Sequence, residues 1–142
     1  MQPGLLNDMP RAGLYYLPAS EQPRLPEMAT NAGLKLLIAD LGDCKDKHAV
    51  LRQLGKTCHF PKWYGVNLDA LHDCLTDLDG QSENGLVLQI SGLNRLDNND
   101  PDACATLIEV LKSAASIRSA GKHPLWILLT SPATGVASLP VA

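Results

Sequence analysis

The sequence predicts an α/β protein in which helices cover a parallel β-sheet. Three apolar segments, at residues 34–41, 85–91 and 125–130, are nearly continuous in Leu, Ile and Val and have the length of strands. Segments with helical periodicity separate them, in the order strand, helix, helix, strand, helix, strand. Strands that are apolar on both faces and alternate with helices are typical of a buried parallel sheet.

Length and composition predict one folded domain with an extension at each end. Of the 142 residues, 45% are hydrophobic and 19% are charged, whereas disordered chains are poorer in hydrophobic residues and richer in charge. We expect an N-terminal extension at 1–32, the domain at 33–131 and a C-terminal tail at 132–142.

The N-terminal extension holds five of the ten prolines, so no long helix is expected there. Its segment 13–17, Gly-Leu-Tyr-Tyr-Leu, is suited to one short strand at a sheet edge, and the rest is expected to be an extended arm. The following segment, 34–41, is expected to be a buried strand that ends at the turn signal Gly42-Asp43.

Three capped helices are expected between the strands. Asp46 is suited to cap a helix that reaches about residue 54, Asn67 one over 68–78, and Asp100, followed by Pro101, one over 101–120. The segment 92–99 is expected to be a loop. The inner sides of the first and third helices are predicted from their apolar spacing to carry Val50, Leu51, Leu54, Leu107, Ile108, Leu111 and Ala115.

An acidic stretch covers the second of these helices. Residues 63–94 contain five acids and no Lys or Arg, so the acidity of a chain with net charge −3 is concentrated there. On an ideal helix over 68–78, the leucines at 68, 71, 75 and 78 share an arc of ~80°, and Asp69, Asp73 and Asp77 share another on roughly the opposite side.

Helix stability does not explain this acidic row. Like charges four residues apart disfavour a helix by ~0.2–0.5 kcal/mol per pair. The row therefore predicts a surface for a basic partner, and the alternative is an ordinary solvated helix face. Trp63 and Tyr64 lie just before the helix, and aromatic rings beside charges are typical of protein interfaces. For Tyr64 we favour the alternative that its ring covers the core.

Composition disfavours several other classes of function. The Lys and Arg residues do not form the clusters typical of nucleic-acid binders, and no stretch approaches the ~18 apolar residues of a membrane span. With no secretory signal and no Cys-x-x-Cys pair, reduced thiols and a cytoplasmic location are expected. Neither Cys58-His59 nor His72 with Cys74 matches a metal motif, and no cofactor motif is present, so neither a metal nor a cofactor is expected.

The segment 60–78, F-P-K-W-Y-G-V-N-L-D-A-L-H-D-C-L-T-D-L, resembles the signature of the barstar family of intracellular ribonuclease inhibitors. Weaker resemblance extends from about residue 34 to residue 130. The resemblance implies a three-stranded parallel sheet packed by helices, to which the N-terminal extension can add a short strand. It also implies a non-catalytic, stoichiometric inhibitor of a basic, guanyl-preferring ribonuclease. Such an inhibitor is expected to be monomeric when free and to bind neither nucleic acid nor membrane directly.

Carried over by position, the resemblance makes Asp73 the central carboxylate, Asp69 its companion and Trp63 the aromatic residue that packs on the enzyme. Carboxylates placed where RNA phosphates bind can accept paired hydrogen bonds from guanidinium groups. The remaining residues expected in the contact are Gly65, Asn67, Leu68, Ala70, His72, Thr76 and Asp77.

The sequence departs from the family pattern at three positions. His72 and Leu78 stand where the inhibitor has Trp, and Ser113 stands near the position of an expected acid on the third helix. These departures favour an alternative, a barstar-fold interaction or regulatory module whose partner is not a ribonuclease. A third reading is a small hydrolase that uses Asp69 and Asp73 as acid and base, which needs a cleft that a convex helix surface does not supply.

Overall fold

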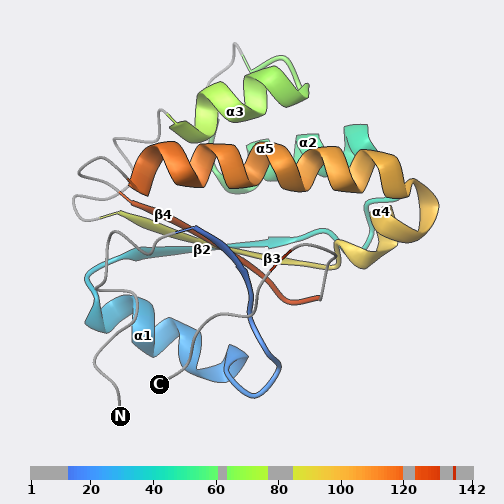
Figure 1. The fold of residues 1–142 in the computed structure, drawn as a ribbon. Coiled ribbons are helices and arrows are strands. Elements are labelled where there is room, and N and C mark those ends of the chain that lie inside the picture. The colour runs from blue at the N-terminus through green and yellow to red at the C-terminus, as the bar shows by residue number, and fades with distance from the viewer. Residues whose placement is uncertain (1–12, 61–63, 77–84, 120–123, 132–135, 137–142) are drawn as a thin grey trace.

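The computed structural model of the protein describes residues 13–60, 64–76, 85–119, 124–131 and 136. These residues form a four-stranded, all-parallel sheet with helices on both faces (Figure 1), which confirms the predicted α/β class. In the order β1-β4-β3-β2 across the sheet, the strands are Leu14–Tyr16, Leu125–Leu129, Leu86–Ser91 and Lys35–Asp40. The helices are α1 (Leu25–Asn31), α2 (Lys47–Thr57), α3 (Leu68–Thr76), α4 (Asn94–Asn99) and α5 (Pro101–Ser119).

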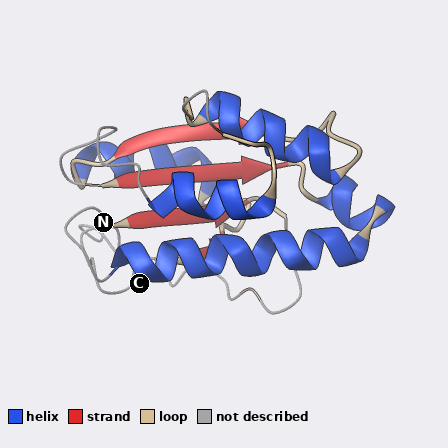
Figure 2. Ribbon diagram, turned by 90° about the horizontal axis from the view of Figure 1, so that it is seen from above, coloured by secondary structure: helices blue, strands red, loops and turns tan. Residues whose placement is uncertain are grey.

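The main core lies between the sheet and the helices α2, α4 and α5. The apolar residues predicted for the inner sides of α2 and α5 are all buried there. Seen from the side and from above, α2 and α5 lie on the sheet, and α3 lies over them as an outer layer (Figures 1 and 2). In the described part of the chain, no element covers the outer side of α3.

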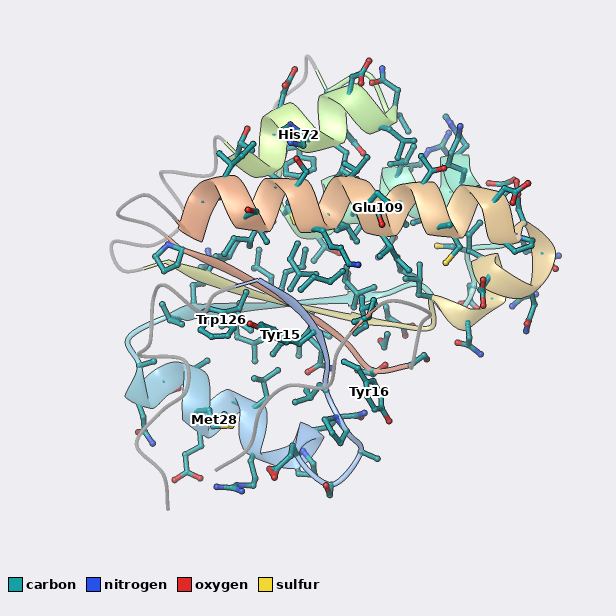
Figure 3. All side chains as sticks on the ribbon, in the orientation of Figure 1. Tyr15, Tyr16, Met28, His72, Glu109 and Trp126 are labelled. Carbon is teal, nitrogen blue, oxygen red and sulfur yellow. The ribbon has the colours of Figure 1, made fainter. Side chains whose placement is uncertain are left out.

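A second apolar cluster lies on the opposite face of the sheet, between the strands and α1, which Figure 1 shows below the sheet. Figure 3 shows Trp126 and Tyr15 on this side of the sheet, and their ring centroids are 5.9 Å apart. Because β1 also pairs with β4 at the sheet edge, residues 14–29, which include β1 and part of α1, contribute to the folded core. The buried residues of this cluster are Leu17, Leu25, Ala29, Leu34, Val87, Trp126 and Leu128.

The helix caps expected from the sequence are confirmed for α2 and α5. The Asp46 carboxylate accepts a hydrogen bond from the Ala49 N–H at 2.8 Å, and the Asp100 carboxylate accepts one from the Ala103 N–H at 3.2 Å. The short strand at 13–17 is confirmed as β1, at the edge of the sheet.

The structure corrects the expectation of an extended arm after β1. A 3-10 turn, Gln22–Arg24, runs directly into α1. Pro23 and Pro26 each occupy a position in the first turn of one of these helices, where the missing N–H would have no helical partner. The prolines therefore limit the length of α1 without preventing it.

Two further expectations are corrected by the way the elements pack. Residues 34–41 are not a buried strand, because β2 lies at the sheet edge and leaves the Ile38 side chain 54% exposed. The expected loop at 92–99 contains α4, whose Leu96 is fully buried. Arg95 donates a hydrogen bond to the Gly42 carbonyl at 3.0 Å, which fastens α4 to the turn after β2.

We predict that Leu25→Ala destabilises the protein by about 2–5 kcal/mol, because it leaves a cavity under α1 where Leu25 is fully buried. Urea denaturation of the full chain measures the change. Glu27→Ala is the matched control, since Glu27 is exposed on the same helix, and it should change stability by less than about 0.5 kcal/mol. Equal effects of the two substitutions would show that α1 does not stabilise the sheet.

Candidate partner-binding surface

Tyr64 fixes the loop before α3 to α2. Its hydroxyl donates a hydrogen bond to the Leu51 carbonyl at 2.7 Å, and its ring meets Phe60 edge to face with centroids 4.9 Å apart. A Cβ at Gly55 would lie 2.5 Å from Cε2 of the Tyr64 ring, so this approach requires glycine within α2. Burial raises the pKa of Tyr64, which keeps its hydroxyl a donor. The prediction that Tyr64 covers the core is confirmed.

A strained residue and a helix cap follow Tyr64. Val66 has φ 53°, in the left-handed region. A non-glycine residue held there costs of order 1–3 kcal/mol, and β-branched residues are rarely found there. The next residue, Asn67, accepts a hydrogen bond from the Ala70 N–H at 2.8 Å through its side-chain oxygen, which confirms the predicted N-cap. The turn at Val66 thus sets the direction in which α3 begins.

The inner side of α3 is apolar and packs mainly on α5. Leu71 and Leu75 are fully buried, Cys74 is 2% exposed and Leu68 is partly buried. Burial of one leucine side chain contributes about 1.5–3 kcal/mol. These contacts hold the helix on the surface and leave its opposite side to solvent.

The outer side of α3 carries two of the predicted carboxylates. Asp69 and Asp73 are both exposed. Within residues 64–76 and the other described ranges, neither carboxylate forms an ion pair or a hydrogen bond. The two acids are therefore open to an external cation.

The other predicted contact residues of the described chain lie on α3 or in the turn before it. Gly65 and Asn67 are exposed, and the rest are intermediate in exposure, namely Leu68, Ala70, His72 and Thr76. The structure therefore brings these predicted residues together. Trp63, Asp77 and Leu78 lie outside the described residues.

A polar pair joins α3 to α5 beside the acids. His72 Nε2 lies 3.0 Å from Ser113 Oγ. Figure 3 shows His72 on α3 and Glu109 on the neighbouring helix α5. The Lys112 ammonium lies 4.0 Å from the Glu109 carboxylate. His72 and Ser113 occupy two of the positions where the sequence departs from the family pattern. Here they form a polar contact with each other.

Arg118 supports the C-terminal end of α3 and was not identified from the sequence. Its Nη1 donates a hydrogen bond to the Leu75 carbonyl at 3.0 Å, and the residue is only 6% exposed. A cation at this end of a helix satisfies a free carbonyl and interacts favourably with the helix dipole. The signal in the sequence was an arginine on the apolar side of α5, seven residues after Leu111.

The buried thiols near α3 are unsuited to chemistry. Burial, together with the neighbouring Cys74, raises the pKa of Cys58 to about 12, so the thiol stays protonated at neutral pH. Among the described residues, no group of three or more His, Cys, Asp or Glu side chains is placed to hold a metal ion. Within the same ranges, no helix is both long and apolar enough to span a membrane.

The family model described as "Barstar (barnase inhibitor)" matches residues 34–130 of the chain. The chain belongs to the barstar family. Members of this family are non-enzymatic inhibitors, so the protein is not an enzyme. The match begins at residue 34, so β1 and α1 precede the part of this barstar-family chain that the model covers.

Comparison with curated proteins gives no match. Among solved structures, the Aeropyrum pernix ORC2 protein is similar, with a TM-score of 0.50 and 15% sequence identity over 84% of this chain. The barstar-family chain spans 35% of the length of that structure. At this identity the likeness concerns the α/β fold alone.

We predict that Arg118→Met destabilises the protein by about 1–3 kcal/mol, because the Leu75 carbonyl loses a charge-assisted hydrogen bond in a buried place. Urea denaturation measures the change. Arg24→Met is the control, because Arg24 is exposed and pairs with Glu21 at 3.0 Å, and such surface pairs contribute at most about 1 kcal/mol. A smaller effect at Arg118 than at Arg24 would contradict the role of Arg118 as a support for α3.

Proposed function

We propose that this barstar-family chain is a stoichiometric inhibitor of a basic, guanyl-preferring ribonuclease of the barnase type. The observation that carries the proposal is the pair Asp69 and Asp73, both exposed on the outer side of an anchored helix and unpaired among the described residues. A ribonuclease must hold RNA phosphates with cationic side chains. Carboxylates presented in the same place would accept the same charge-assisted hydrogen bonds and block the substrate.

The anchoring of α3 supports tight binding by these two acids. Aspartate has a short side chain, so little rotamer freedom is lost when its carboxylate is held by a partner. The helix itself is already fixed by Leu71 and Leu75 inside, by the Tyr64 hydroxyl before it and by Arg118 at its end. A surface that is ordered before binding loses less entropy on association.

In this proposal Asp73 is the central contact, Asp69 is its companion and Asp77 extends the negative charge along the helix. Trp63 packs on the rim of the enzyme. The surface around them is formed by Gly65, Asn67, Leu68, Ala70, His72 and Thr76. We call this set of residues the acidic surface. It binds protein rather than nucleic acid, and the free inhibitor is a monomer in the cytoplasm.

A second candidate is a barstar-fold interaction module whose partner is not a ribonuclease. It is favoured by the hydrogen bond between His72 and Ser113, which uses two polar groups at positions where the family pattern has a tryptophan and an acid. Titration of the purified protein into barnase distinguishes the candidates. If RNA cleavage is lost completely when one equivalent of the protein has been added per barnase, the inhibitor is supported. If cleavage is undiminished, the interaction module is supported.

We predict that Asp73→Ala weakens inhibition of barnase by about 2–5 kcal/mol, the usual effect of removing one partner from a buried charge pair. Its melting temperature should be equal or higher, because a repulsion with Asp69 four residues away is relieved. Asp102→Ala is the charge-matched control at an exposed position of α5 and should leave inhibition unchanged. A marked fall in melting temperature for Asp73→Ala would mean that Asp73 is structural.

We predict that the association rate with barnase falls by about tenfold or more when the salt concentration rises from about 50 to 500 mM, because salt screens attraction between exposed charges. Stopped-flow fluorescence measures this rate. The dissociation rate should change less, since it depends on contacts already made. An association rate that is independent of salt would remove electrostatic steering from the proposal.

A further inference from the structure

The outer side of α2 carries a basic face that ribonuclease inhibition does not use. Residues 45–62 hold five Lys or Arg and a single acid, Asp46, and no Asp or Glu occurs from residue 47 to residue 68. We define the basic face as five residues of the described chain, all of them exposed: Lys45, His48, Arg52, Lys56 and His59.

Helix geometry gathers three of these residues into a row. His48, Arg52 and Lys56 are four residues apart, so they lie one above the other on the same side of α2. That side is opposite to Leu54, which is buried in the core. The Arg52 guanidinium donates a hydrogen bond to His48 Nε2 at 3.0 Å. This bond holds the guanidinium on the outer side of the helix.

Stability of α2 does not explain this row. Arg52 and Lys56 are like charges four residues apart, and such pairs disfavour a helix. Only Lys56, in the last turn, is placed favourably. Among the described residues, no ion pair is formed by the three Lys and Arg side chains of the basic face. Their charges are available to a ligand.

We propose that the basic face of α2 binds the phosphate backbone of a single-stranded nucleic acid. Phosphates are the ligand that cationic side chains bind through charge alone, without an apolar contact. Each Lys or Arg that neutralises a phosphate releases counterions, and this release provides the free energy of binding. The helical part of the face is 11 residues long, which corresponds to about 16 Å and suits a short stretch of a strand.

The surroundings of the basic face disfavour a protein or a membrane as the ligand. A stable protein interface has a buried apolar or aromatic anchor at its centre. In the described chain the exposed large hydrophobic residues are Ile38 on β2 and Ile117 on α5, and neither is on α2. A helix that inserts into a membrane surface needs an exposed apolar side, whereas that side of α2 is in the core.

The negative net charge of the protein restricts binding of a nucleic acid to the basic face of α2. The whole chain carries −3, so a polyanion is not attracted to the molecule in general. The acidic surface of α3 lies on the same side of the sheet as α2 and repels phosphates (Figures 1 and 2). A strand can therefore bind only where the positive charges of α2 are concentrated. This inference uses no residue of the acidic surface and does not rest on ribonuclease inhibition.

Fluorescence anisotropy of a labelled oligouridylate of about twelve nucleotides, titrated with the full-length protein, tests the proposal. The logarithm of the affinity should fall linearly with the logarithm of salt concentration, by about 0.7 per phosphate neutralised. With three Lys and Arg side chains available, the slope should be near −2. The double variant R52Q/K56Q should move the slope toward zero by about 1.4 and lower the affinity at low salt by about tenfold or more.

The double variant R24Q/K112Q is the matched control. It removes the same net charge from the 3-10 turn Gln22–Arg24 and from α5, where each cation has an acidic neighbour three residues away, and it should bind the oligonucleotide as the unmodified protein does. Thermal melting verifies that both variants are folded. A deoxyoligonucleotide of the same length should bind similarly if the backbone is recognised.

Three results would overturn the proposal. The first is no binding of either oligonucleotide at about 25 mM salt. The second is an equal loss of affinity in the two double variants, which would assign binding to total charge rather than to α2. The third is binding of phosphatidylserine vesicles or of an acidic polypeptide such as polyglutamate that is as tight as binding of the oligonucleotide and as sensitive to R52Q/K56Q.

Discussion

Burial of Leu71 and Leu75 beneath α3 is the interaction on which the acidic surface depends. A helix of nine residues is only marginally stable in water, and two like charges on one side weaken it further. Packing of the apolar side on the core and on α5 stabilises the helix enough to form. The same packing directs Asp69 and Asp73 to solvent, since the helical period places them on the opposite side.

Contacts at both ends of α3 fix the position of this helix on the core. Before it, the Tyr64 ring lies against Gly55, and the left-handed Val66 leads directly into the Asn67 cap. After it, the buried Arg118 holds the Leu75 carbonyl. Backbone strain such as that at Val66 persists only where the surroundings determine the conformation. Such a concentration of fixed contacts around one short helix is consistent with a surface that binds without rearrangement.

The two charged helices give the protein surfaces of opposite sign on one side of the sheet. The outer side of α2 is basic and that of α3 is acidic, and each lacks a compensating charge of its own. On the other side of the sheet, α1 covers an apolar face that includes Trp126 and Leu128, and β1 extends the sheet beside β4. β1 and α1, which precede the family-matched segment 34–130, thus contribute to the core, while both charged helices lie within that segment.

The sequence by itself determined the α/β class, the caps at Asp46, Asn67 and Asp100, and the separation of leucines from aspartates on α3. All of these follow from local spacing, because a helix or strand period fixes which residues share a side. The edge strand β1 was also foreseen from its short apolar run. The family resemblance came from an unbroken motif, and the acidic row was visible because its residues are close together along the chain.

Only the tertiary structure decided how distant segments meet. The edge position of β2, the helix α1 among the prolines and the partner of Arg118 each depend on contacts made by residues far apart in sequence, which no local pattern encodes. The hydrogen bond between His72 and Ser113, 41 residues apart, is of the same kind. The row on α2 follows from the same four-residue spacing as the acidic row, but only the structure shows that Arg52 and Lys56 form no ion pair among the described residues.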